Sequence, residues 1–425
     1  MTADKAAPAS GSILVVGGGI SGLTTALEAA EVGYEVLVVE KNPYLGGRVA
    51  QLNQYFPKLC PPTCGLEINF RRIKDNPKIK IITLAEVQKV EGEPGNYDVQ
   101  IKISPRYVND NCVACNECVK VCPVERKNDF NFGLDNSKTI YRPFEMSFPM
   151  KYVIDGSTCL GAECAKCVAA CKYSAIDLGM EAKTIDLKVG AIVWATGWTP
   201  YDANKIDNLG FGKHANIITN MILERYASPN GPTKGKIVRP SDGKGIESIA
   251  FVQCAGSRDE NHLPYCSYVC CMASLKHATY IREQYPDANI YIFYIDLRTP
   301  GLRYEKFYNK IKEDDKIFFI KGKVAEVSED PATNNITVVA ENAVTGEKIR
   351  QNVGMVVLAT GMQPTNAISK LPAELNCNSD GFIINNFEKG GMFAAGCANK
   401  PADVVSSNQN ATGMALKAIQ TLVRR

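Results

Sequence analysis

Cysteine gives the clearest chemical signal in this chain of 425 residues, which contains 16 of them. One run has the spacing C-x2-C-x2-C-x3-C-P and consists of Cys112, Cys115, Cys118 and Cys122. A second run repeats the pattern with a longer first gap and consists of Cys159, Cys164, Cys167 and Cys171. Closely spaced thiolates of this kind hold [4Fe–4S] clusters. The sequence therefore predicts two such clusters and an electron-transfer role.

The same spacing occurs in bacterial two-cluster ferredoxins, in which the last cysteine of each run binds the cluster of the other run. By this rule the ligands of one predicted cluster are Cys112, Cys115, Cys118 and Cys171. The ligands of the second are Cys159, Cys164, Cys167 and Cys122. Zinc is an alternative, because four thiolates also hold structural zinc. Zinc sites pair two CxxC units and do not need the third and fourth cysteines of each run, so we favour iron–sulfur clusters.

Two further groups of cysteines are less familiar. The first comprises Cys254, Cys266, Cys270 and Cys271. Thiols so close together are costly to leave without a partner, so a third [4Fe–4S] cluster is predicted, with inert buried thiols or a redox disulfide as alternatives. The second is the CPPTC pair, Cys60 and Cys64, for which a redox role and a proline-stiffened loop with packed thiols both remain open.

A glycine-rich turn predicts a dinucleotide site near the start of the chain. Gly17, Gly19 and Gly22 form GxGxxG between a predicted strand (12–19) and a predicted helix, and Glu40 ends the next strand. The glycines permit a tight turn, close approach to a pyrophosphate and close helix–strand packing, and the helix N-terminus favours the anion. An acidic residue at the end of the second strand can accept a hydrogen bond from a ribose hydroxyl.

Three further motifs favour FAD over NAD by their resemblance to flavoproteins with two dinucleotide domains. They are GGR at Gly46–Arg48, ATG at Ala195–Gly197 and Ala359–Gly361, and FAAGC at Phe393–Cys397. Such enzymes carry an aspartate where this chain has Cys397, which is alternatively a small buried residue. The predicted FAD contacts are Gly17, Gly19, Ile20, Ser21, Gly22, Glu40, Lys41, Gly47, Arg48, Ala195, Thr196, Gly197, Gly361, Gly396 and Cys397.

A second βαβ pattern lacks its phosphate-binding glycines. Where thioredoxin-reductase-like enzymes place a GxGxxG for NADPH, this chain has FVQCAGSRDENHLPYCSYVCC, which keeps only Gly256. Direct oxidation of NAD(P)H is therefore not expected. The three histidines, His214, His262 and His277, are too scattered to indicate a site.

These motifs predict an α/β fold of the thioredoxin/glutathione-reductase type, with two dinucleotide domains and an inserted ferredoxin-like segment. The expected FAD-binding domain comprises residues 1–105, 181–200 and 346–425, and its residues 78–103 suit an antiparallel meander. The insertion is expected at 106–180, a linker region at 201–245 and the second nucleotide-fold domain at 246–345.

The overall composition excludes several classes of protein. The net charge is +3, from 48 basic and 45 acidic residues, so no nucleic-acid surface is indicated. The most apolar stretches are shorter than the roughly 20 residues of a membrane span. The opening MTADKAAPASGS has no apolar signal core, so we expect a cytoplasmic protein that a partner subunit would hold at any membrane.

Taken together, the motifs resemble the A subunit of heterodisulfide reductase. The similarity runs from VVGGGISGL through NIITN, GKIVRPSDGK and FVQCAGSRDE…PYCSYVCC to FAAGCANKPADV. Within that family, the short length and the segment EKNPYLGGRVAQLNQYFPKLCPPTCGLEINFRRIK are similar to the A subunit of the quinone-interacting membrane-bound oxidoreductase complex of sulfate reducers. That complex connects the menaquinone pool with adenylylsulfate (APS) reductase.

The resemblance implies FAD, a B subunit with its own flavin and clusters, and a C subunit that is anchored in the inner membrane and carries haem and the quinone contact. It also ties the Cys254 group to a [4Fe–4S] cluster. The expected function is electron transfer between menaquinol and APS reductase, and no acid–base residue is predicted because electron transfer needs none. The alternatives are a bifurcating or ferredoxin- or NAD(P)H-linked subunit of heterodisulfide-reductase type, and a structural flavin-fold scaffold.

Overall fold

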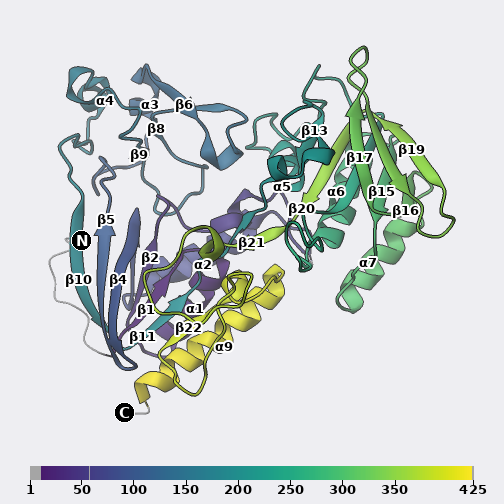
Figure 1. Ribbon diagram of the computed structural model, residues 1–425. Coiled ribbons are helices and arrows are strands. Elements are labelled where there is room, and N and C mark those ends of the chain that lie inside the picture. The colour runs from purple at the N-terminus through teal and green to yellow at the C-terminus, as the bar shows by residue number, and fades with distance from the viewer. Residues whose placement is uncertain (1–10, 57, 424–425) are drawn as a thin grey trace.

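The computed structural model describes residues 11–56 and 58–423, which form two α/β units and a small cysteine-rich lobe (Figure 1). Most of the opening segment, where no signal core was predicted, lies outside these residues. The first unit is built on a parallel sheet of order β22-β11-β1-β2-β3. Its strands are β1 (Ile13–Val16), β2 (Val36–Glu40), β3 (Ile79–Thr83), β11 (Ala191–Trp194) and β22 (Met392–Ala394).

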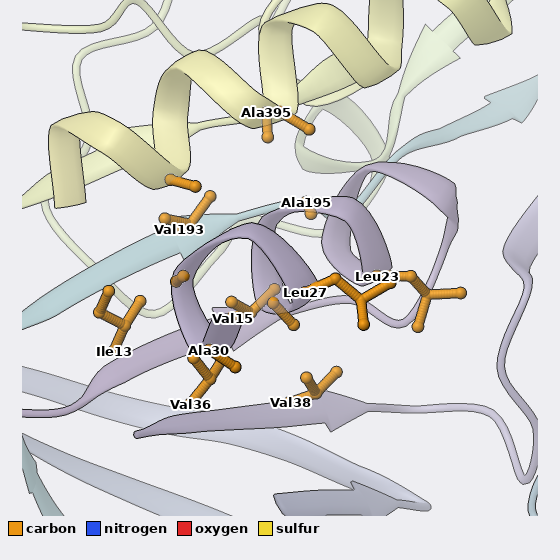
Figure 2. Close-up of a cluster of buried hydrophobic side chains, with 14 of the residues drawn as sticks. Ile13, Val15, Leu23, Leu27, Ala30, Val36, Val38, Val193, Ala195 and Ala395 are labelled. Atoms are coloured by element: carbon orange, nitrogen blue, oxygen red, sulfur yellow. The ribbon is translucent and has the colours of Figure 1, made fainter. Parts of the chain in front are cut away.

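Both faces of this sheet are buried, which explains the continuous apolar runs of its strands. On one face lie α1 (Ile20–Glu31) and α9 (Val404–Val423), and Figure 2 shows Leu23 and Leu27 of α1 over Val15 and Val38. The opposite face packs against an antiparallel sheet of order β10-β5-β4. That sheet consists of β4 (Ala85–Glu93), β5 (Asn96–Ile103) and β10 (Lys183–Val189).

The cysteine-rich lobe connects the end of β5 to the start of β10. These two strands pair directly, with Ile103 opposite Lys183, so the chain enters and leaves the lobe at neighbouring points. Two short helices, α3 (Glu117–Val121) and α4 (Lys166–Ala170), pack against each other within it. The lobe also contains the paired strands β6 (Glu125–Lys127) with β7 (Asn136–Lys138) and β8 (Ile140–Tyr141) with β9 (Val153–Ile154).

The second unit has a parallel sheet of order β13-β20-β14-β15-β16, covered by α5 (Asn220–Ala227), α6 (Cys270–Gln284) and α7 (Leu302–Lys312). The strands are β13 (Ile217–Thr219), β14 (Ser248–Ala255), β15 (Asn289–Tyr294), β16 (Ile317–Lys321) and β20 (Met355–Thr360). A three-stranded antiparallel sheet packs on its other face and consists of β17 (Val324–Glu329), β18 (Ile336–Glu341) and β19 (Lys348–Val353). The antiparallel pair β12 (Trp198–Pro200) and β21 (Met362–Pro364) connects the two units.

Three predicted assignments differ from this arrangement. Within 78–103, β3 belongs to the parallel sheet, and only β4 and β5 form a meander. Within 201–245, β13 and α5 are part of the second unit instead of a linker. Within 346–425, β19 and β20 also belong to the second unit. Local periodicity marks such segments as strands, but it does not tell which sheet they join.

One buried arginine contacts both α/β units and the cysteine-rich lobe. Arg225, on α5, is fully buried and lies over the ring of Phe130 at 4.7 Å. It donates hydrogen bonds to the Asn131 side chain in the lobe (2.8 Å), the Gln51 carbonyl in the first unit (2.9 Å) and the Asn230 side chain (2.7 Å). Burial lowers its pKa to about 10, so the guanidinium remains charged at neutral pH.

Within the described residues, no helix is long and apolar enough to cross a membrane.

Two glycines inside helices provide a matched test of the β1–α1 packing. A Cβ at Gly22 would lie 1.8 Å from the Gly17 carbonyl oxygen, whereas a Cβ at Gly413 of α9 would meet nothing within 4 Å. We expect Gly22→Ala to lower the free energy of unfolding by about 1–3 kcal/mol. Gly413→Ala should instead raise it by about 0.5–1 kcal/mol. Urea unfolding followed by the fluorescence of the two tryptophans, Trp194 and Trp198, measures both, and an unaffected Gly22→Ala would contradict the packing.

Candidate functional site

The turn between β1 and α1 forms one end of a large cavity. Gly17 has a φ of +112°, and a Cβ there would lie 2.3 Å from the carbonyl oxygen of Ala195, so the predicted ATG segment touches the glycine turn. Gly19 is the N-cap residue of α1 and, having no side chain, makes no capping hydrogen bond. The first backbone N–H groups of α1 are therefore open to an anion such as a pyrophosphate.

Glu40 lies at the end of β2 beside this turn. Its carboxylate is buried and accepts hydrogen bonds from the backbone N–H of Gly18 (2.6 Å) and of Asn42 (2.7 Å). Burial raises the pKa of Glu40, and these backbone N–H groups partly oppose that shift. The hydrogen bonds fix the carboxylate at the place where a ribose hydroxyl is read in dinucleotide folds.

The cavity has a volume of about 520 Å³, within the range of small-molecule sites. The predicted FAD contacts that line it are Gly17, Gly19, Ile20, Ser21, Glu40, Lys41, Gly47, Arg48, Ala195, Thr196, Gly197 and Cys397. Gly22 and Gly396 lie just behind this wall, against Gly17 and Ser21 respectively. The structure does not bring Gly361 to this cavity. It follows β20 of the second unit and lies against Ser257 and Ser267, so its assignment as an FAD contact was wrong.

The polar atoms of the cavity wall fit a polar ligand. Trp194 Nε1, Thr196 Oγ1 and one terminal nitrogen of Arg126 are buried, belong to residues of the cavity wall and have no hydrogen-bond partner among the described residues. Buried donors left without a partner are costly, and the phosphate, ribityl and ring oxygens and nitrogens of FAD would supply acceptors. The side chains present therefore fit FAD.

Several cavity residues were not predicted. Tyr44 and Phe130 meet edge to face at 5.6 Å, and the Arg126 guanidinium lies 4.5 Å from the centre of the Tyr141 ring. Phe130, Arg126 and Tyr141 belong to the cysteine-rich lobe, and nothing in the sequence shows that the lobe folds over the first unit. Asp403 and Ser407, at the start of α9, also line the cavity. The position of α9 directly after FAAGC is the signal that could have identified them.

The lobe groups its eight cysteines around two separate cavities. One is lined by Cys112, Cys115, Cys118 and Cys171. The other is lined by Cys122, Cys159, Cys164 and Cys167. In the part of the chain that the structure describes, no three His, Cys, Asp or Glu side chains gather tightly enough for a single metal ion. Each cavity has four thiols in its wall, the number of ligands that a [4Fe–4S] cluster takes. Burial raises the pKa of the free Cys118 thiol to about 12, so metal ligation would be needed to hold its thiolate.

The third group of cysteines surrounds the loop between β14 and α6. Cys254 near the end of β14 has a φ of +56°, and Cys270 and Cys271 begin α6. Burial, and after it the neighbouring Cys271 and Cys266, raise the pKa of Cys254 to about 11. Cys266 Sγ accepts a hydrogen bond from the backbone N–H of Tyr268 at 3.4 Å. These four residues occupy the place of the missing NADPH phosphate loop.

Cys60 and Cys64 lie at the start of α2 (Pro62–Asp75), and neither lines the flavin cavity. Cys64 is exposed and Cys60 is half-buried, and neither forms a disulfide. Their role stays a prediction.

Comparison with known families agrees with both parts of the site. An NAD(P)-binding Rossmann-like domain matches residues 15–78, and a 4Fe-4S dicluster domain matches residues 105–176. Among solved structures, thioredoxin reductases of T. acidophilum (15% identity) and Lactococcus lactis (13% identity) both have a TM-score of 0.52. Each match covers 97% of this chain, with 97% and 99% of the other chain. The predicted fold class is confirmed, and at these identities the likeness shows the fold alone.

Curated relatives extend along nearly the whole chain. The second iron–sulfur A subunit of the CoB–CoM heterodisulfide reductase of Methanopyrus kandleri is 40% identical over 96% of this chain and 64% of its own length. The A subunit of the H2:CoB-CoM heterodisulfide,ferredoxin reductase of Methanothermobacter thermautotrophicus is 37% identical over 97% of this chain and 64% of its own. The chain thus spans slightly less than two thirds of the length of these relatives. The predicted resemblance to the A subunits of heterodisulfide reductases is confirmed over nearly the whole chain.

Proposed function

We propose that this chain is an electron-transfer subunit of heterodisulfide-reductase type, in which FAD exchanges single electrons with [4Fe–4S] clusters. The observation that carries the proposal is that the cysteine-rich lobe supplies part of the flavin cavity wall, through Arg126, Phe130 and Tyr141. The clusters, which carry one electron each, and the flavin, which carries two, would therefore lie in adjoining parts of one polypeptide. FAD, when bound, supplies the ability to take two electrons together or one at a time.

The chain's own residues bind and orient the carriers. The first turn of α1 faces the pyrophosphate position, Glu40 faces the ribose position, and Arg48 is held by its hydrogen bond to the Trp198 carbonyl at 3.2 Å. Trp198, in the flavin cavity wall, and Val269, the residue before Cys270, pack against the same buried cluster of Met362, Cys397 and Ala402.

The ligand sets follow from the grouping of the thiols. We assign one cluster of the lobe to Cys112, Cys115, Cys118 and Cys171, and the other to Cys122, Cys159, Cys164 and Cys167. A third cluster is assigned to the Cys254, Cys266, Cys270 and Cys271 group, whose thiols are close together and buried or half-buried.

Electron partners are proposed at two levels. The relatives' names favour a heterodisulfide-reductase-type complex with further subunits, linked to ferredoxin or a similar donor. A narrower proposal is the quinone-linked complex of sulfate reducers, with a flavin- and cluster-bearing B subunit, a membrane-anchored C subunit, and APS reductase as acceptor. It is supported by the similarity of the segment 40–74 and would place this chain at the cytoplasmic face of the inner membrane.

Stepwise reduction of the anaerobically purified protein tests the electron-transfer role. We expect one FAD and two or three cubanes per chain, each of about four irons. Photoreduction should bleach the flavin and produce cluster EPR signals in the same titration. NADH and NADPH should not bleach the flavin, because the second unit has cysteines where the phosphate loop would be. A flavin that stays oxidised while the clusters are reduced would favour the scaffold alternative.

Serine variants test the exchange of ligands between the two cysteine runs. Cys115→Ser and Cys171→Ser should each remove the same EPR signal and about four irons, while FAD is retained. Cys167→Ser should remove the other signal. Cys377→Ser serves as the control, because the Cys377 sulfur lines neither lobe cavity and accepts a hydrogen bond from the Asn366 side chain at 3.2 Å. If Cys171→Ser removed the same signal as Cys167→Ser, the exchanged assignment would be wrong.

The third cluster has a separate test in Cys266→Ser. The half-buried position of Cys266 should let the variant fold. We expect a loss of about four irons, with both lobe signals and the flavin unchanged. A variant that kept its full iron content would show that the Cys254 group holds no cluster.

A further inference from the structure

Gln253 has a buried side chain whose polar atoms are left without partners. The residue is 5% exposed, and within the described residues neither its amide oxygen nor its amide nitrogen forms a hydrogen bond. Burying an amide without hydrogen bonds costs free energy, so such a group is expected to face a ligand. Gln253 directly precedes Cys254, the first residue of the third group of cysteines.

The side chain of Gln253 points to the helix-covered face of the second sheet. Ile249 and Phe251, earlier on β14, pack in the core beneath α5 and α6, whereas Ala250 and Val252 pack on the opposite face. Because side chains alternate along a strand, Gln253 continues the row of Ile249 and Phe251. Its amide is therefore the polar end of an otherwise apolar row.

That row leads to the N-terminal end of α6. The ring of Phe251 lies 6.2 Å from the ring of His277 on this helix. Because α6 connects β14 to its parallel neighbour β15, the helix runs back against the direction of β14. Gln253 is two residues, or about 7 Å, further along the strand. It therefore lies about one helical turn closer to Cys270 and Cys271, which begin the helix.

The sulfurs of these two cysteines contact the ends of the strands on either side of β14. The Cys270 thiol donates a hydrogen bond to the carbonyl oxygen of Thr360, the last residue of β20, at 3.7 Å. The Cys271 thiol donates to the carbonyl oxygen of Asp296, just after the end of β15, at 3.7 Å. In the sheet, β14 lies between β20 and β15. Gln253, near the end of the middle strand, thus lies between the two strand ends that these sulfurs contact.

The backbone around Gln253 is irregular. The register between β14 and β20 shifts between Val252 and Ala255, and Cys254 has a φ of +56°. Bulges of this kind redirect side chains and are frequent beside functional sites. Ser274 Oγ, on α6, is likewise buried without a partner among the described residues, so it does not hold the Gln253 amide.

We propose that the side-chain amide of Gln253 donates a hydrogen bond to a sulfur of the [4Fe–4S] cluster assigned to the third group of cysteines. The inference rests on that assignment and adds a residue that sets the reduction potential of the cluster. A reduced cluster carries one more negative charge than an oxidised one, and an N–H donor stabilises negative charge on sulfur. Gln253 therefore raises the reduction potential of this cluster.

A redox titration of the anaerobic holoprotein, followed by EPR, tests the role of Gln253. The relevant signal is the one that Cys266→Ser removes. Gln253→Met keeps the length of the side chain and removes the donor. We expect its reduction equilibrium to shift about tenfold toward the oxidised cluster, which is about 59 mV for a one-electron couple. The potentials of the flavin and of both lobe clusters should stay unchanged.

Gln284→Met is the matched control, because it makes the same exchange at the last residue of α6. The Gln284 amide donates a hydrogen bond to the Gly235 carbonyl at 2.9 Å and lies about 21 Å along the helix from Cys270. This variant should keep every potential of the unmodified protein. An unchanged third-cluster potential in Gln253→Met would overturn the inference.

A second measurement needs no substitution. Protein labelled with ¹⁵N at the side-chain amide of glutamine should show a ¹⁵N coupling on the third-cluster signal in pulsed EPR. Absence of this coupling would also overturn the inference, and the coupling decides alone if Gln253→Met does not fold. Full iron content in Cys266→Ser would instead refute the third cluster itself, so the two failures are distinguishable.

Discussion

The relative placement of the three parts of this molecule depends on one buried cation. Within the described residues, Arg225 donates four hydrogen bonds and none to a carboxylate: one goes to the lobe, one to the first unit and two to its own neighbour Asn230. Burying a guanidinium is costly unless its donors are satisfied, so these acceptors must remain where they are. Because the cation also lies over Phe130, it fixes the residue that brings the lobe into the flavin cavity.

The chemistry of the cysteines and of the glycine turn could be predicted from the sequence because both depend on short, fixed spacings. Gly17, Glu40 and Ala195 line the predicted cavity, and each cavity of the lobe gathers cysteines from both runs. The two-domain flavoprotein fold was predictable for the same reason, since each βαβ unit has a local pattern of apolar strand, turn and helix.

Contacts between distant segments could not be predicted in this way. Gly361 and Gly197 end the same ATG motif. The strand before Gly361 belongs to the parallel sheet of the second unit, however, and a local motif does not show which sheet its strand joins. Phe130 and Arg225 come from segments without a motif, and their roles depend on how the lobe folds back. His277 was set aside because the histidines are scattered in the sequence, whereas its partner Glu224 is distant in the chain and adjacent in space.

The place where the lobe joins the first unit has an evolutionary consequence. Ile103 and Lys183 are paired neighbours at adjacent strand ends, so the strands before and after the lobe would form the same sheet if a short turn replaced everything between them. Closely spaced ends are the usual condition for tolerated domain insertion. The cysteine-rich lobe could therefore have entered an ancestral reductase as a single insertion, with no change to the flavin-binding fold around it.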